Sequence, residues 1–216
     1  MQDLTSFQHP RFARTYERMS RQADQATAAV RIRLLAGLRG RIVEVGAGNG
    51  LNFPHYPGRV EGVDEVVAVE PENLLRAAAE RAAGTAPVPV RVVPGHADAL
   101  PFEAASFDAV VLSLVLCSVP DQAAALAEAR RVLRPGGELR FFEHVRSTHP
   151  VRGPLQDLVT PLWRRLGGGC HLNRDTAAAI EVAGLRIEEL DRFAHRPLPG
   201  GPVLTHILGR ARAPRR

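Results

Sequence analysis

A strand that runs directly into a glycine-rich turn is the feature that most constrains the fold of this chain. Residues 41–50 read RIVEVGAGNG, so an apolar, β-branched run ends at three glycines spaced G-x-G-x-G. Glycine tolerates the positive φ that such a turn needs, and it lets the backbone approach a bound molecule closely. The pattern predicts a sheet that opens onto a nucleotide-like ligand.

The spacing of these glycines separates two classes of ligand. A dinucleotide fingerprint is G-x-G-x-x-G, and Leu51 stands where its third glycine is expected. Glu44 lies two residues before the turn, where a carboxylate would repel a pyrophosphate but could pair with an ammonium or another cation. NAD is therefore disfavoured.

Two further acidic residues lie where a ligand site would need them. Glu70 ends the apolar run 66–69 and follows Gly46 by 24 residues, close to the separation of about 20 residues found for ribose-binding acids in such units. Asp98 lies in the segment 95–102. Its ordinary alternative is a loop residue that caps a turn with its own side chain.

Together these motifs resemble the class I methyltransferases, and in particular their methyltransferase type 11, or UbiE-like, domains. Residues 44–50 resemble motif I of this family, and residues 106–112 and 133–139 resemble its fourth strand and the turn before its fifth. The resemblance implies that the cofactor is S-adenosyl-L-methionine, with Glu70 on the ribose and Asp98 on the adenine. The cofactor-binding residues that it implies are Glu44, Gly46, Ala47, Gly48, Asn49, Gly50, Glu70, Pro71, Ala97, Asp98, Ala99 and Leu114.

Strands and helices alternate along the chain, which predicts a parallel sheet covered on both faces. The expected strands span 41–45, 66–70, 90–93, 109–116, 138–144, 185–193 and 203–210, and the expected helices span 72–83, 122–133 and 173–183. We expect an α/β fold with a Rossmann-like seven-stranded sheet, mostly parallel. The resemblance implies an antiparallel last strand, and residues 197–202 would form a hairpin-like reversal before it.

The chain is expected to form one domain, since 216 residues suffice for a sizeable core. An amphipathic helix is predicted over residues 10–38, with an interruption near Asp24 as an alternative. We expect residues 1–40 to be a helical cap of the same domain and residues 41–216 to be the methyltransferase domain.

Composition excludes two chemistries. The sequence has no lysine, so all 28 basic side chains are arginine, and a Walker A lysine and a pyridoxal-phosphate Schiff base are both ruled out. The arginines are spread along the chain, so the net charge of +5 predicts no nucleic-acid partner. The one cluster, Arg210, Arg212, Arg215 and Arg216, is expected to be a solvated tail, with contact to an anionic lipid surface as the alternative.

No membrane-spanning or secretory segment is predicted. The longest apolar run, residues 109–119, is shorter than the roughly 20 residues that span a bilayer, and the N-terminus lacks an apolar signal core. We expect a cytoplasmic protein, with peripheral membrane contact left open and no prediction of oligomeric state.

The two cysteines predict no metal site. Cys117 and Cys170 fall in no C-x-x-C pattern, so neither a zinc site nor a disulfide is indicated. His171 follows Cys170, but two neighbouring ligands are a weak signal. Cys117 is expected to be a small buried side chain within a strand.

The acceptor site is expected at the carboxyl ends of the strands, as in other open α/β sheets. Residues 114–119 (LVLCSV), 142–145 (FEHV) and 169–174 (GCHLNR) resemble the methyltransferase-like proteins that methylate alkyl thiols. The resemblance implies a small-molecule thiol as acceptor. Animal members of that group carry an N-terminal membrane anchor, and we identify none here.

The chemistry of a thiol acceptor requires no strong base, because a thiol of pKa about 8.5 is already a few per cent thiolate at pH 7. His144 and His171 are the candidate catalytic residues, as a base or an orienting group. Each could instead bond a backbone carbonyl or face solvent, and Glu143 could anchor either one. An amine, a quinol or phenol, or a phospholipid head group remain alternative acceptors, and a non-catalytic S-adenosylmethionine-binding protein is a further alternative.

Overall fold

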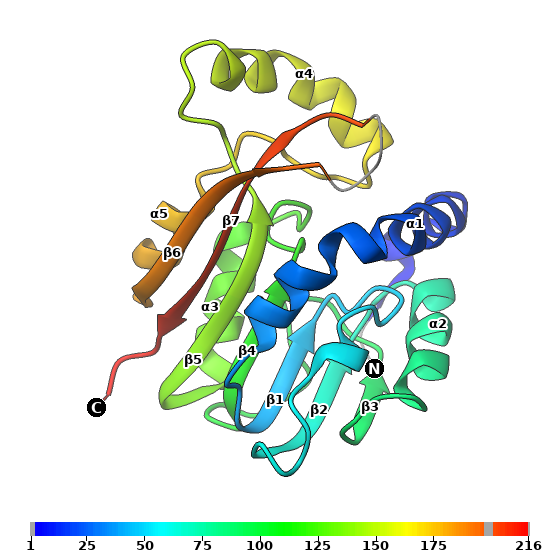
Figure 1. Cartoon of the computed structure of the whole chain (residues 1–216), viewed down its shortest axis with the longest axis vertical. Helices are drawn as coiled ribbons and strands as arrows, with labels where there is room; N and C mark the ends of the chain where they lie inside the picture. The colour runs from blue at the N-terminus through cyan, green and yellow to red at the C-terminus, as the bar shows by residue number, and fades with distance from the viewer. Residues whose placement is uncertain (1–2, 197–200, 216) are drawn as a thin grey trace.

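Seven strands form one mixed sheet in the computed structural model, which describes residues 3–196 and 201–215. The order across the sheet is β3-β2-β1-β4-β5-β7-β6 (Figure 1). The strands are β1 Gly40–Val45, β2 Val63–Val69, β3 Val90–Val93, β4 Phe107–Ser113, β5 Leu133–His144, β6 Arg186–His195 and β7 Leu204–Arg212. The first five strands pair in parallel, and β7 is antiparallel to both β5 and β6. The predicted fold class is confirmed.

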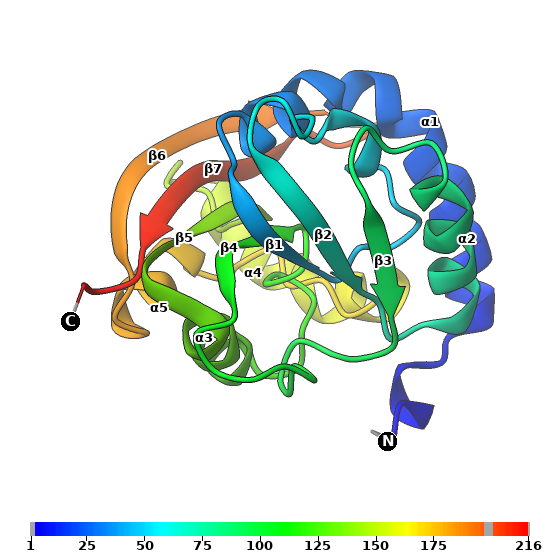
Figure 2. The same ribbon diagram turned by 90° about the horizontal axis from the view of Figure 1, so that it is seen from below.

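Helices cover both faces of the sheet (Figures 1 and 2). Helices α1 (Pro10–Leu35) and α2 (Asn73–Ala83) lie over one face, and α3 (Gln122–Val132) and α5 (Thr176–Val182) lie over the other. Helix α4 (Arg152–Leu166) stands at the end of the sheet where β5 finishes.

The strand sequences explain this arrangement, since successive side chains of a strand point to opposite faces. In β1, Ile42 belongs to the core under α1, and Val43 belongs to the core under α3. Both are fully buried. A nearly continuous apolar strand is what a sheet buried on both faces requires.

Side-chain caps fix the starts of three helices. Asp121 accepts hydrogen bonds from the backbone N–H groups of Ala123 and Ala124, at 2.9 and 3.0 Å. Glu72 caps α2 and Asp175 caps α5 in the same way. Such caps satisfy donors that have no partner within the helix.

Two predicted boundaries were wrong, and so was the alternative of an interrupted first helix. Helix α1 runs without interruption past Asp24, whose carboxylate lies 3.6 Å from Arg31 on the same helix. Strand β4 ends at Ser113, so Cys117 lies in the loop after the strand, although it is buried as predicted. The turn predicted over residues 133–139 is part of β5, where Gly136 has a φ of +75°.

Helix α4 was not predicted. Its leucines point away from the protein, while Gly153, Gln156 and Thr160 face inward and are buried. The carboxamide of Gln156 accepts from the backbone N–H of Ser147 at 2.6 Å and donates to the carbonyl of Val145 at 3.3 Å. A polar anchor therefore ties α4 to the end of β5.

The C-terminal arginines were predicted as a solvated tail, and for two of them this was wrong. Arg210 and Arg212 lie in β7 and form ion pairs with Glu188 at 3.7 and 3.1 Å. Arg216 and residues 197–200 of the predicted reversal lie outside the described residues. Within the described part of the chain, no helix has both the length and the apolar character needed to cross a bilayer.

Candidate active site

The glycine turn after β1 has the backbone conformation that its sequence predicts. Gly46, Gly48 and Gly50 have φ values of +68°, +58° and +78°. The backbone N–H of Gly46 donates to the carbonyl of Val69 at 2.8 Å. A Cβ on Gly46 would lie 2.7 Å from a methyl group of Val115, so the loop after β4 packs directly on the turn.

Glu70 is fixed next to this turn. One carboxylate oxygen accepts from the backbone N–H of Gly48 at 2.8 Å, and the other accepts from the N–H of Glu72 at 3.0 Å. Burial raises the pKa of Glu70 to about 7. The structure therefore brings together the glycine turn and the acid that the sequence assigned to the ribose.

Glu44 lies beneath the turn and is already paired with its own chain. Its two oxygens accept from the Asn52 amide at 2.8 Å and from the Tyr56 hydroxyl at 2.7 Å. Burial raises its pKa to about 7. In the structure Glu44 holds segment 52–56 under the glycine turn, and contact with an ammonium group stays a prediction.

Asp98 lies in the loop between β3 and β4, at the same end of the sheet as the glycine turn. Its Oδ1 is buried and has no hydrogen-bond partner among the described residues, and burial raises its pKa. Ala97 beside it is buried, and the ring of Phe7 stacks on His96 at a centroid distance of 4.8 Å. A buried acceptor without a partner fits a ligand that supplies a donor.

The N-terminal segment closes over this edge. Tyr16 of α1 lies over Gly48, where a Cβ would be 3.5 Å from its ring. Asn49 donates to the hydroxyl of Ser20 at 3.0 Å, and Gln8 donates to the carbonyl of Pro71 at 2.8 Å. Sequence reasoning missed these contacts, because nothing in an amphipathic pattern says which loop a helix will cover.

The loop after β4 forms the other side of the site and is held from both directions. Leu114 has a φ of +61°, and its N–H donates to the carbonyl of Phe142 at 2.7 Å. Arg174 donates to the carbonyls of Leu116 and Val119, the latter at 2.8 Å. Sequence reasoning placed this loop near the acceptor but did not identify Arg174 as its anchor.

The sequence allowed Glu143 to anchor His144 or His171, but the structure gives its carboxylate other partners. Its fully buried carboxylate accepts from the backbone N–H groups of Val115 and Leu116, both at 2.9 Å, and from that of Cys117 at 3.1 Å. Burial raises the pKa of Glu143 well above its usual value. The residue thus fixes the loop after β4.

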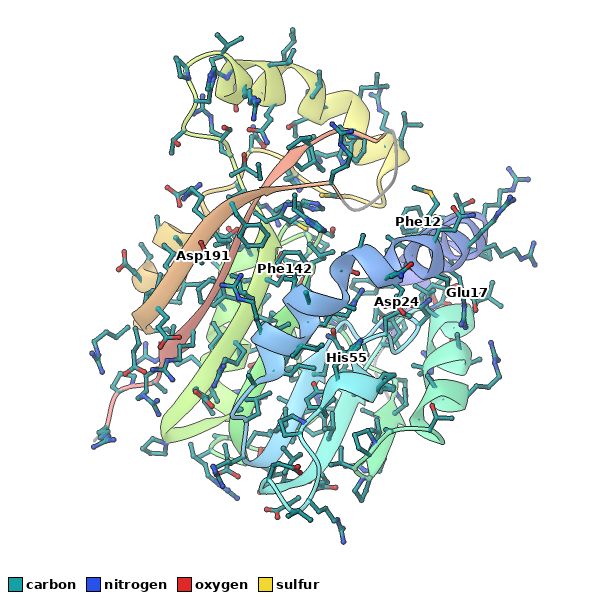
Figure 3. All side chains as sticks on the ribbon, in the orientation of Figure 1. Phe12, Glu17, Asp24, His55, Phe142 and Asp191 are labelled. Carbon is teal, nitrogen blue, oxygen red and sulfur yellow. The ribbon has the colours of Figure 1, made fainter. Side chains whose placement is uncertain are left out.

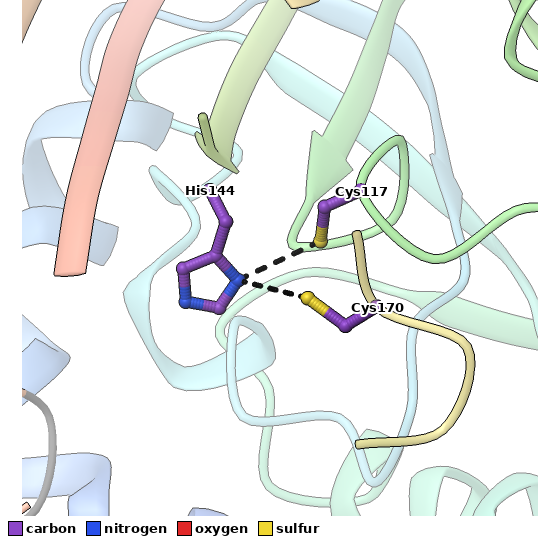
Figure 4. A group of neighbouring side chains, drawn as sticks. All are labelled: Cys117, His144 and Cys170. Carbon is purple, nitrogen blue, oxygen red and sulfur yellow. Dashed lines mark hydrogen bonds between the residues drawn. The ribbon is translucent and has the colours of Figure 1, made fainter. Parts of the chain in front are cut away.

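The two candidate histidines both lie against Cys117. Nδ1 of His144 is 3.7 Å from the sulfur of Cys117 and 3.5 Å from that of Cys170 (Figure 4). His171 donates its backbone N–H to the Cys117 carbonyl at 2.7 Å, and its ring Nδ1 lies 3.2 Å from the same oxygen. Burial lowers the pKa of His171, so its ring is neutral at pH 7.

These observations define a class I methyltransferase. The sheet order, the glycine turn, the acid fixed at the end of β2 and the unpaired Asp98 oxygen fit S-adenosylmethionine, a nucleoside with a cationic side arm. The enzyme is S-adenosylmethionine-dependent, and when bound this cofactor supplies an electrophilic methyl group.

Comparison with known proteins agrees with this class. A methyltransferase domain model matches residues 43–141. Human thiol S-methyltransferase TMT1B is 37% identical over 83% of this chain and 74% of its own length, and human TMT1A is 35% identical over 82% and 72%. A solved S-adenosylmethionine-dependent methyltransferase from Mesorhizobium loti has the same fold, with a TM-score of 0.63, 22% identity, and coverage of 87% of this chain and 97% of its own. The chain belongs to the same methyltransferase family as TMT1A and TMT1B.

Proposed function

We propose that this enzyme transfers a methyl group from S-adenosylmethionine to the sulfur of a small-molecule thiol. The observation that carries the proposal is that the side chains around Cys117, beyond the glycine turn, form an apolar wall of the site. Cys117, Cys170 and Leu172 form a buried apolar cluster, against which Leu114 and Trp163 pack. Such a wall suits a lipophilic acceptor. The names of the human relatives support the same acceptor class.

The cofactor-binding residues follow from the described contacts. We propose that residues 46–50 form a cradle, with Gly48 permitting close approach of the ligand, and that Glu70 accepts from the ribose hydroxyls. Asp98, with Ala97 and Ala99 beside it, would receive the adenine amino group. Pro71 and Leu114 would line the two sides of the cofactor site. We also propose that residues 1–40 act as a helical cap of the same domain.

On the acceptor side, the chain has to hold the sulfur in line with the methyl group and exclude water. His144 is the proposed residue nearest the acceptor sulfur, because its ring nitrogen lies among the two cysteine sulfurs. His171 is proposed to shape the wall through its two contacts with the Cys117 carbonyl. We propose a cytoplasmic location, since both cysteines are free thiols and thiols persist in a reducing compartment.

The test is an acceptor panel. The protein would be incubated with methyl-labelled S-adenosylmethionine and a set of alkyl and aryl thiols, amines, phenols, quinols and phospholipids, and the methylated products would be identified by mass spectrometry. We expect labelled thioethers. Transfer to amines, quinols or lipids with none to thiols would overturn the thiol assignment, and no transfer to any class would favour a binding protein.

Cofactor affinity is expected to depend on pH through Glu70. Because its pKa is raised to about 7, the carboxyl is protonated in the free protein below that pH, whereas ribose hydroxyls donate best to the ionised form. Affinity should therefore rise with pH up to about 7 and then level off, weakening below it by up to about tenfold per pH unit. Calorimetric titration of S-adenosylmethionine between pH 5.5 and 8.5 measures this.

The variant Glu70→Gln separates this effect from other groups that titrate in the same range, including Glu44. The part of the pH dependence that Glu70 causes should be absent from the variant, and any dependence that remains belongs to the other groups. Wild-type affinity that is equal at pH 5.5 and pH 8 would show that ionised Glu70 does not bind the ribose.

The outward face of α4 supports a proposal of peripheral membrane contact. The exposed side chains form a row at helical spacing, and they are Leu155, Leu158, Val159, Leu162 and Leu166. Arg152 and Arg165 flank the row and are exposed. An exposed apolar stripe bordered by arginines complements an anionic bilayer surface, and we propose such a surface as its partner.

The double variant Leu158→Glu/Leu162→Glu is expected to lower binding to vesicles of phosphatidylcholine and phosphatidylserine by at least about tenfold, because two exposed apolar anchors are lost. Co-sedimentation measures it. Val182→Glu is the matched control, since Val182 is 89% exposed on α5, away from this stripe. Light scattering that shows a dimer abolished by the double variant, with no vesicle binding by the wild type, would assign the stripe to a second copy instead.

A further inference from the structure

We propose that Cys117, His144 and Cys170 form a zinc site with an open fourth position that takes the acceptor thiol. The three side chains come from two loops and the end of β5, and their ligand atoms all lie within 4.8 Å of one another (Figure 4). This inference rests on the proposed thiol function, which it makes specific. Spacing in the sequence did not reveal the site, because each ligand lies at least 26 residues from the next.

The two nitrogen–sulfur separations within this cluster are close to those of zinc ligands. With zinc–sulfur bonds of about 2.3 Å and zinc–nitrogen bonds of about 2.0 Å, tetrahedral geometry places a sulfur and a nitrogen roughly 3.5 Å apart. Nδ1 of His144 lies 3.5 Å from the Cys170 sulfur and 3.7 Å from the Cys117 sulfur. One cation among the three atoms would require little movement.

The backbone around the ligands is already fixed, as a metal site requires. The N–H of Cys117 donates to Glu143 and its carbonyl accepts from His171. The N–H of Cys170 donates to the carbonyl of Gly167 at 3.2 Å. Both cysteines are therefore held by hydrogen bonds on their own backbones.

A buried donor beside the cluster points to a thiolate. The indole Nε1 of Trp163 is buried and has no hydrogen-bond partner among the described residues. Trp163 packs against the cluster that contains Cys117 and Cys170. A metal-bound thiolate at Cys170 would give the indole N–H an acceptor.

With three protein ligands, the zinc ion would keep its fourth coordination position open, as in catalytic zinc sites. Two thiolates and a neutral imidazole would balance the charge of Zn²⁺, and a thiolate as the fourth ligand would give the site a net charge of −1, which the cationic sulfonium of the cofactor can offset. The acceptor thiol would bind as a thiolate and release its proton to solvent. Its sulfur lone pair then forms the new carbon–sulfur bond while the sulfonium–methyl bond breaks, and the bonding pair stays on the sulfur of S-adenosylhomocysteine. The neutral thioether is a weaker ligand and dissociates.

Metal titration of the whole chain tests the site. Reduced, chelator-treated protein would be titrated with Zn²⁺ by calorimetry and with Co²⁺ by absorption spectroscopy. We expect one metal per chain, a thiolate-to-cobalt charge-transfer band, and a change in the visible cobalt bands when an alkyl thiol is added. Cys117→Ser, Cys170→Ser and His144→Gln should each weaken zinc binding by about 100-fold, while His9→Ala, at an exposed position, should not.

Binding of S-adenosylmethionine, read by thermal shift, confirms that each variant is folded. Absence of zinc binding by the folded wild type would overturn the site, whether or not thiols are methylated. Zinc binding without a change in the cobalt bands on adding thiol would overturn the open position. If the metal titration is positive but the zinc-loaded enzyme methylates no thiol, the proposed function fails and the three-ligand site remains.

Discussion

Replacing Glu70 by glutamine is expected to weaken S-adenosylmethionine binding by about 100-fold, or ~2.7 kcal/mol. The ionised carboxylate is the acceptor for Gly48 and Glu72 as well as the proposed acceptor for the ribose. A glutamine amide offers one acceptor in place of two and points a donor at a backbone N–H, so both the ligand contact and the turn are disturbed. Isothermal titration calorimetry measures the loss.

Glu80→Gln is the matched control, because Glu80 is an exposed carboxylate on α2 close in sequence to the same site. The affinity of the Glu80→Gln variant for S-adenosylmethionine should equal that of the wild type. A Glu70→Gln protein that keeps wild-type affinity would remove Glu70 from the cofactor site.

Glu143→Ala is expected to destabilise the protein by about 3–4 kcal/mol. The change leaves three buried backbone N–H groups, those of residues 115–117, without their acceptor and opens a cavity in a fully buried position. Each unsatisfied buried donor costs about 1–3 kcal/mol before relaxation, and truncation of a buried side chain adds to this. Urea unfolding at pH 7 measures the difference.

Glu143→Gln should be milder, at about 1–2 kcal/mol, since the amide oxygen can still accept from two of the three donors. Glutamine fills the same volume as glutamate, so a pure packing role would leave Glu143→Gln as stable as the wild type, and the loss in this variant is the part that reports the hydrogen bonds. A Glu143→Gln protein with wild-type stability would contradict the assignment of Glu143 as the acceptor that holds this loop.

The sheet could be predicted from the sequence because its signals are local. The strand over residues 41–45 is an apolar run that stops at glycine, and the strand ending near Glu70 stops at proline. Both lie where the pattern predicted, and the structure brings Glu70 to Gly48. The parallel part of the sheet followed from the alternation of strands and helices, the antiparallel β7 was implied by the family resemblance, and both are confirmed.

The acceptor side could not be predicted to the same depth, because its contacts are non-local. Cys117 and Cys170 are 53 residues apart, and contacts between their two loops, among them the bond from the backbone of His171 to the Cys117 carbonyl, bring them together. Helix α4 escaped prediction for a different reason. Its leucines face outward and its glutamine faces inward, the reverse of the pattern by which a surface helix is recognised.

Helix α1 touches both halves of the site. Tyr16 lies over Gly48 on the cofactor side, and Phe12, labelled in Figure 3, packs against Gly168 on the acceptor side. The two residues are one helical turn apart in an unbroken helix of 26 residues. A single turn of α1 therefore borders both the glycine turn and the loop that leads to Cys170, so a change in the position of this turn would alter the surroundings of both segments at once.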